Sequence, residues 1–167
     1  AAGDLLLGDP DSPVLLERAW ENAPPVGHEV RIVERRGCDP NPIDPTTTDG
    51  RLTLTSYVWG DMLSRLERLR GALDIAARVP AVVEQAGALD FLRGELAEPR
   101  EDVTTVLWHS VMWQYVDPAE RQEVEALLLD LTHPVVRISL EPEPRTFAFR
   151  VHATSYPSGH LVHLADA

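Results

Sequence analysis

The chain contains no lysine and a single cysteine, and each scarcity removes a class of chemistry. All 15 of its basic residues are arginine, so a Schiff-base lysine and a P-loop lysine are excluded within these residues. One cysteine, Cys38, cannot form an internal disulfide, which favours a reducing compartment, and we expect a cytoplasmic protein. No two glycines are separated by one residue, so the dinucleotide-binding and nucleophile-elbow motifs are also missing.

Basic residues are also few relative to acidic ones. With 27 acidic residues against 15 arginines the net charge is −12, which argues against a nucleic acid or an anionic membrane surface as partner. No apolar run reaches the ~20 residues needed to span a bilayer. The length of 167 residues and the apolar fraction of 44% are typical of a globular protein. We therefore expect one domain over residues 1–167, with a small molecule as the candidate ligand.

Hydrophobic periodicity predicts strands that alternate with helices. Strands are expected at residues 29–35, 79–83, 102–108 and 134–140, and helices at residues 61–78, 89–96 and 117–131. In the last helix, Asp117 is the expected N-cap, Pro118 the first residue, and Glu120 the capping-box acid. Residues 52–59 fit either a strand or an irregular lead-in to the next helix.

Turn-forming residues predict two hairpins, one at each end of the chain. Residues 1–20 surround a cluster of Gly, Asp, Pro and Ser, and they are expected to form a hairpin extension. Residues 145–164 alternate around a second turn and predict a terminal hairpin. This order predicts an α/β fold with a mostly parallel sheet and an antiparallel edge.

Residues 108–115 concentrate polar and aromatic side chains directly after a predicted strand. Open α/β sheets present functional side chains at the carboxyl ends of their strands, so His109 or Ser110 is expected to reach into a crevice. Alternatively, Trp108, Trp113 and Tyr115 are core aromatics and His109 bonds to the backbone. His109 and Ser110 do not form a catalytic dyad, because neighbouring side chains on a strand point to opposite faces.

Two further segments carry candidate site residues. An acid just past a second strand, as Asp39 is, can hold ribose hydroxyls in nucleotide-binding folds. The spacing favours the alternative, in which Asp39 and Asn41 form Asx-turns and Asp44 caps a turn. Trp59 is either a core or a ligand-facing aromatic. The histidines have no zinc-type helical spacing, and we expect no metal site.

Residues 34–44, 56–61 and 106–115 together resemble a bacterial family known as domain of unknown function 2332. The resemblance implies a three-layer Rossmann-like, methyltransferase-like mixed sheet that binds S-adenosylmethionine. It also implies that this chain is the carboxyl-terminal half of a longer protein and is incomplete at its amino-terminal side, where such folds have a central strand. Loss of that strand predicts self-association, or an upstream segment that completes the sheet.

The resemblance also assigns roles. His109 or Tyr115 would orient or deprotonate the methyl acceptor, while Asp39, Asn41 and Asp44 would face the cofactor. The residues expected to contact the acceptor are Trp59, Ser110, Trp113 and Gln114. The alternative is a non-catalytic ligand- or protein-binding domain of the same fold. A hydrolase that uses Ser110 with His109 or His152 lacks an elbow motif.

Overall fold

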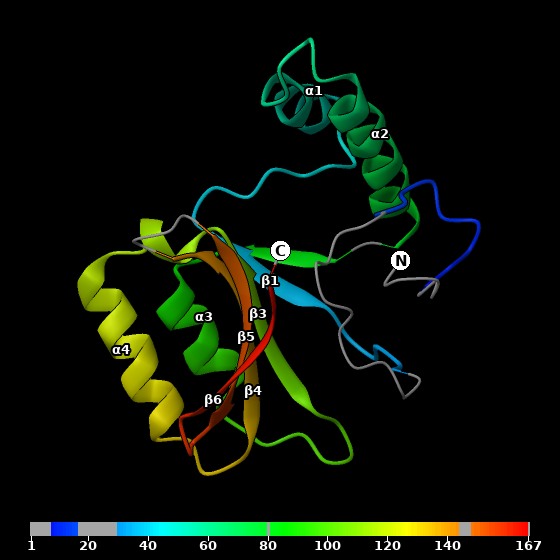
Figure 1. Ribbon diagram of the computed structural model, residues 1–167. Coiled ribbons are helices and arrows are strands. Elements are labelled where there is room, and N and C mark those ends of the chain that lie inside the picture. Colours follow the sequence, from blue (N-terminus) through cyan, green and yellow to red (C-terminus); the bar gives the residue numbers. More distant parts are fainter. Residues whose placement is uncertain (1–7, 17–29, 80, 144–147, 167) are drawn as a thin grey trace. The chain divides into compact units, whose positions relative to one another are not determined.

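The protein is described by a computed structural model that covers residues 8–16, 30–79, 81–143 and 148–166 (Figure 1). Internal contacts group the chain into two compact units, and each is described by itself. The first comprises Ala1–Arg18 with His28–Ala86, and the second comprises Ala19–Gly27 with Gly87–Ala167. The expectation of one domain over the whole chain stays a prediction.

The first unit contains a parallel strand pair with two intervening helices. Strand β1 (Arg36–Asp39) pairs with β2 (Val82–Gln85), and the chain between them forms α1 (Thr48–Ser56) and α2 (Leu63–Arg78). Helix α1 begins where the Thr47 hydroxyl accepts a hydrogen bond from the Gly50 amide at 3.0 Å, an ordinary N-cap. Because parallel neighbours need a crossover connection, this unit is a strand–helix–helix–strand motif.

The second unit contains a four-stranded mixed sheet in the order β3-β4-β5-β6. Strands β3 and β4 run parallel and are connected through α4, whereas β5 and β6 extend the sheet as antiparallel neighbours. The elements of this unit are α3 (Ala88–Glu95), β3 (Thr105–Ser110), the 3-10 turn η1 (Trp113–Tyr115), α4 (Pro118–Leu129), β4 (Val135–Pro142), β5 (Phe149–Tyr156) and β6 (His160–Asp166).

Helices α3 and α4 pack together on one face of this sheet, and the core lies between the helices and the strands (Figure 1). Val124 and Leu128 of α4 are fully buried, as is Val135 at the start of β4. The rest of the buried cluster is Leu89, Leu92, Leu96, Leu131 and Tyr156. Full burial of one such side chain stabilises the fold by about 1.5–3 kcal/mol. This core anchors the end of β3 from which the candidate site projects.

The structure confirms an α/β fold with a mixed sheet and an antiparallel terminal hairpin, formed by β5 and β6. One predicted strand was wrong, and neither interpretation of residues 52–59 holds for most of that segment. Residues 30–35 form no strand, and the paired residues are instead Arg36–Asp39. Most of residues 52–59 lies in α1, which ends at Ser56. In the expected hairpin at 1–20, residues 8–16 contain no strand, and the remainder falls outside the described residues.

The predicted start of α4 was partly right. The Asp117 carboxylate accepts from the Ala119 amide at 2.8 Å, and Pro118 begins the helix, as expected. Glu120 does not complete a capping box within α4. Its Oε1 accepts instead from the Leu89 amide at 3.1 Å, in the first turn of α3. A carboxylate is stabilised beside the positive end of a helix, so Glu120 joins α4 to α3.

Candidate functional site

The carboxyl ends of β3 and β4 bring a histidine and a glutamate together. His109 on β3 lies opposite Ser139 on β4, and Glu141 follows two residues later on the same face of that strand. The Nδ1 atom of His109 lies 2.8 Å from Oε1 of Glu141. Register in a parallel pair, rather than proximity in sequence, therefore creates this contact.

The turn after β3 folds back onto the same glutamate oxygen. The backbone amides of Met112 and Trp113 each donate to Glu141 Oε1 at 3.2 Å. The turn passes through Val111, whose φ of +52° lies in the left-handed region that β-branched residues rarely adopt. The Val111 amide donates to the Leu140 carbonyl at 2.9 Å, which holds the turn against β4. A strained turn at a strand end is a feature that often accompanies function.

An aromatic ring and a cation complete the surroundings of His109. The Trp113 ring stacks on the imidazole, with 5.0 Å between ring centroids and 25° between their planes. The Arg137 guanidinium lies 5.7 Å from the centroid of the same Trp113 ring. The His109 side chain is only 9% exposed and that of Glu141 20%. The imidazole is therefore enclosed on its stacked side and anchored at one nitrogen.

The surroundings of His109 favour its neutral form. Desolvation by burial is the main reason that its pKa lies below the ordinary value, and the charge of Arg137 acts in the same direction. The hydrogen bond to Glu141 and the charge of that residue oppose this effect. Because a carboxylate only accepts hydrogen bonds, Nδ1 carries the proton and Nε2 carries the lone pair. Nε2 is buried and has no hydrogen-bond partner among the described residues.

A second polar cluster supports the site from the side of α4. Arg137 donates to Glu125 Oε2 at 2.7 Å, and the Tyr156 hydroxyl donates to Glu125 Oε1 at 2.7 Å. Burial, followed by the hydrogen bond to Glu125, raises the pKa of Tyr156 well above its ordinary value. The Arg137 guanidinium also lies 5.3 Å from the Tyr156 ring centroid. These contacts fix Arg137 beside Trp113.

Of the residues predicted in 108–115, the structure brings only His109 and Trp113 into contact. Ser110 follows His109 along β3, so its side chain points to the other face of the sheet. Gln114 is exposed and Tyr115 is 81% exposed, and no interaction joins either to His109 among the described residues. Their predicted roles in catalysis and substrate binding stay predictions.

The residues predicted to face a cofactor lie in the first unit and form local turns. Asp39 Oδ1 accepts from the Asn41 amide at 2.7 Å. Asp44 Oδ1 accepts from the Thr46 hydroxyl at 2.6 Å and from the Thr46 amide at 2.8 Å, and these bonds lower the pKa of Asp44. Both turns are of the Asx type that the spacing favours. Trp59 also lies in this unit and is 77% exposed.

Glu141 is the residue of the candidate site that the sequence analysis missed. It lies 32 residues after His109, and no local motif joins the two. A usable signal was present, because Glu141 follows the apolar run of a second predicted strand. Side chains at the carboxyl ends of neighbouring parallel strands meet at one edge of a sheet.

The described residues contain neither a cluster of metal-binding side chains nor a membrane-spanning helix. Within them, no group of three or more His, Cys, Asp or Glu side chains is placed to hold a metal ion. No helix in the described part of the chain combines the length and the apolar character needed to cross a bilayer.

Comparison with known proteins identifies a family. The family model described as "Uncharacterized protein conserved in bacteria (DUF2332)" matches residues 1–167. The chain belongs to this bacterial family. The family expected from the sequence is thereby confirmed, although the match along the entire chain makes "carboxyl-terminal half" an inexact description. No curated protein and no solved structure matches the chain.

Proposed function

We propose that this chain is a methyltransferase-like enzyme domain in which His109 acts as the general base. The supporting observation is the hydrogen bond from His109 Nδ1 to Glu141, which leaves Nε2 as a proton acceptor with no partner among the described residues. Glu141 fixes both the tautomer and the orientation of the ring, as the acid does in Ser-His-Asp enzymes. A neutral imidazole at pH 7 is the form that can take a proton from an acceptor hydroxyl or amine.

S-adenosylmethionine is the proposed co-substrate, and the residue proposed to hold it is Asp39. This carboxylate is exposed at the carboxyl end of a parallel strand, where α/β folds bind ribose hydroxyls. The Asn41 amide bonds to Oδ1 of Asp39, while Oδ2 forms no described hydrogen bond and fits a hydroxyl donor. Both oxygens of a turn-forming carboxylate can accept more than one bond, so the Asx-turn is compatible with this role. When bound, the co-substrate would supply the methyl group.

One observation favours a second candidate function, a non-catalytic binding domain of the same fold. His109 Nε2 is buried, so a substrate proton reaches it only if the residues that cover it move. In this alternative the contact between His109 and Glu141 serves to hold the turn at residues 111–116, and the exposed side chain of Tyr115 contacts a partner. The two functions differ in whether the chain binds a nucleoside co-substrate.

Calorimetric titration of S-adenosylhomocysteine into the wild-type chain and two variants tests the proposal. Asp39→Asn keeps an oxygen for the Asn41 amide but removes the charge, and we expect it to weaken binding by about tenfold, or roughly 1.4 kcal/mol. Asp49→Asn, an exposed acid in the first turn of α1, is the matched control and should bind as wild type does. Absence of binding to a folded wild-type chain contradicts the methyltransferase proposal and supports the binding domain.

A further inference from the structure

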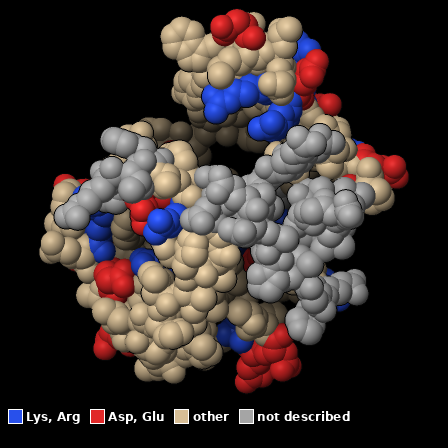
Figure 2. All heavy atoms as spheres, viewed as in Figure 1, with Lys and Arg blue, Asp and Glu red and all other residues tan. Residues whose placement is uncertain are grey.

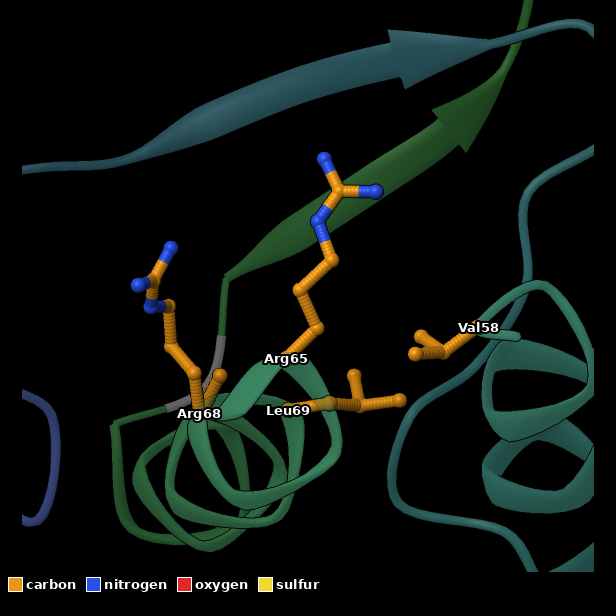
Figure 3. Close-up of a pocket in the computed structure, with 5 residues that line it drawn as sticks. Val58, Arg65, Arg68 and Leu69 are labelled. Atoms are coloured by element: carbon orange, nitrogen blue, oxygen red, sulfur yellow. The ribbon is translucent and has the colours of Figure 1, made fainter. Parts of the chain in front are cut away.

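A hollow on the helix pair of the first unit is the strongest remaining feature. It has a volume of about 270 Å³ and lies beside the turn that joins α1 to α2. Its lining consists of Val58, Arg65, Arg68, Leu69 and Ala72. Figure 3 shows the Arg65 and Arg68 side chains extending from α2 on the same side, while the side chains of Leu69 on α2 and Val58 on the connection after α1 point toward each other. The hollow is therefore lined by three apolar side chains and two guanidinium groups.

Neither guanidinium in this hollow has an acidic partner. Among the described residues, no carboxylate lies within ion-pair distance of Arg65 or Arg68, and the Arg65 guanidinium donates to the Met62 sulfur at 3.9 Å. Six of the thirteen arginines in the described part of the chain pair with carboxylates. These are Arg36, Arg51, Arg93, Arg100, Arg137 and Arg150.

The spacing of the two arginines brings their charges together. Positions i and i+3 of a helix are neighbours, and like charges at this spacing repel each other. In Figure 2, arginine side chains gather on the visible face of the α1–α2 pair. By contrast, Arg70 lies two residues from Arg68 on α2 and does not line the hollow. An anion bound between Arg65 and Arg68 would relieve their repulsion.

We propose that this hollow binds a small organic anion whose carboxylate or phosphate group sits between Arg65 and Arg68. Guanidinium groups donate paired hydrogen bonds to these anions in a matching planar geometry. A short apolar group on the ligand would lie against Val58, Leu69 and Ala72. The volume is near the lower end of small-molecule sites, which limits the ligand to a compact one. None of the lining residues belongs to the site around His109, and this proposal does not depend on the proposed methyl transfer.

Calorimetric titration with four probes tests the site. Hexanoate and monohexyl phosphate carry both required parts, 1-hexanol lacks the charge, and inorganic phosphate lacks the apolar group. We expect at least one of the two hexyl anions to bind with a dissociation constant of about 1 mM or lower, and each of the other two probes at least about tenfold more weakly. Tighter binding of hexanoate would identify the preferred group as a carboxylate, and tighter binding of monohexyl phosphate would identify it as a phosphate.

Three variants make the test specific to the hollow. Arg65→Gln and Arg68→Gln should each weaken binding of the preferred hexyl anion by about tenfold or more, because each removes a charged donor. Arg70→Gln is the matched control and should change the affinity by less than about twofold, with a circular dichroism melt to verify folding of all variants. Equal weakening by Arg70→Gln, equal binding of 1-hexanol, or no saturable binding of either hexyl anion would overturn the proposal.

Discussion

Glu141 organises the candidate site because one of its oxygens serves three donors. Oε1 lies within hydrogen-bond distance of His109 Nδ1 and of the Met112 and Trp113 amides. Each of these donors belongs to β3 or to the turn that follows it, whereas Glu141 belongs to β4. The charge of one side chain therefore holds a neighbouring strand end and its turn in place. Removal of this acceptor leaves three donors without it at once, and the bonds from His109 and Trp113 are partly buried.

Glu141→Ala is expected to lower the free energy of unfolding by about 2–4 kcal/mol, because it leaves two backbone amides and an imidazole N–H without their hydrogen-bond acceptor. Urea denaturation monitored by circular dichroism measures the effect. Glu143→Ala is the matched control on the same stretch of chain, since Glu143 pairs with Arg150 and is more exposed. This control substitution should lower the free energy of unfolding by less than about 1 kcal/mol. A loss at Glu141 no larger than the loss at Glu143 would refute the organising role.

The lowered pKa of His109 makes a stability prediction with a definite sign. Its folded pKa lies below the unfolded value of 6.5, so the unfolded chain binds more protons between those two values. The neutral ring thus stabilises the fold fully above pH 6.5, and this contribution declines as the pH falls toward the folded pKa. Urea denaturation at several pH values, compared with His109→Gln, should show the wild-type advantage shrinking as the pH is lowered from about 7 to about 5. If the stability advantage of the wild type over His109→Gln grew as the pH was lowered, the pKa of His109 would be raised and the prediction would be wrong.

At the scale of elements, the turn between β3 and η1 stores backbone strain. Val111 has a φ of +52°, whereas the next residue, Met112, has a φ of −121°. Both side chains are 37% exposed, so they lose similar packing when truncated. A left-handed conformation costs a non-glycine residue about 1–2 kcal/mol, and glycine does not bear this cost.

Val111→Gly is therefore expected to raise the free energy of unfolding by about 0.5–1 kcal/mol, after allowance for the greater entropy of the unfolded glycine. Met112→Gly should lower it by about 1 kcal/mol, because its backbone gains nothing from glycine. Thermal and urea denaturation of the two variants give the comparison. If Val111→Gly destabilises as much as Met112→Gly does, the turn is not strained in solution.

Elements with local signals could be predicted from the sequence, and those that depend on distant contacts could not. Helix α4 was located because Asp117 and Pro118 mark its start in the chain itself. Helix α1 was missed because the alternation of apolar and polar residues at 52–55 resembles that of a strand. In the structure, Gly50 of this helix packs so closely against the Asp44 carbonyl that a side chain would not fit. Tertiary packing outweighs a weak strand propensity of this kind.

The same distinction applies to the candidate site. His109 and Trp113 could be predicted because both follow the recognisable apolar run at residues 103–107. Glu141 could not be assigned from local pattern, because its contact with His109 depends on the β3–β4 register. The Asx-turn of Asp39 was an alternative that the spacing favoured, and the structure contains it. The proposed cofactor role of Asp39 is independent of that turn and needs a binding measurement.

At the scale of the whole molecule, β3 is an edge strand of the mixed sheet that the described residues form. Within the described residues, β3 has β4 as its only strand neighbour. Val106 and Trp108 of β3 are 48% and 62% exposed. Parallel strands are usually covered on both faces, and an apolar edge strand is a template for another strand.

We therefore expect the chain to self-associate through β3 at micromolar concentration. Size-exclusion chromatography with light scattering should give a mass at least twice the 18.5 kDa of one chain. Val106→Lys places a charge on the edge strand β3 and should shift the population toward monomer. Leu161→Lys on β6, at a site that is 57% exposed, is the matched control and should leave the mass unchanged. A wild-type monomer would contradict this expectation.

The central claim is that Glu141 holds His109 as a neutral base with the proton on Nδ1. Long-range ¹H–¹⁵N correlation spectroscopy of the imidazole at pH 7.5, in the wild-type chain and in Glu141→Gln, measures this directly. The account predicts a protonated Nδ1 and an unprotonated Nε2 in the wild type, and a mixture of tautomers or a shifted Nδ1 resonance in the variant. A doubly protonated ring, a proton on Nε2, or a spectrum that the substitution leaves unchanged would contradict it.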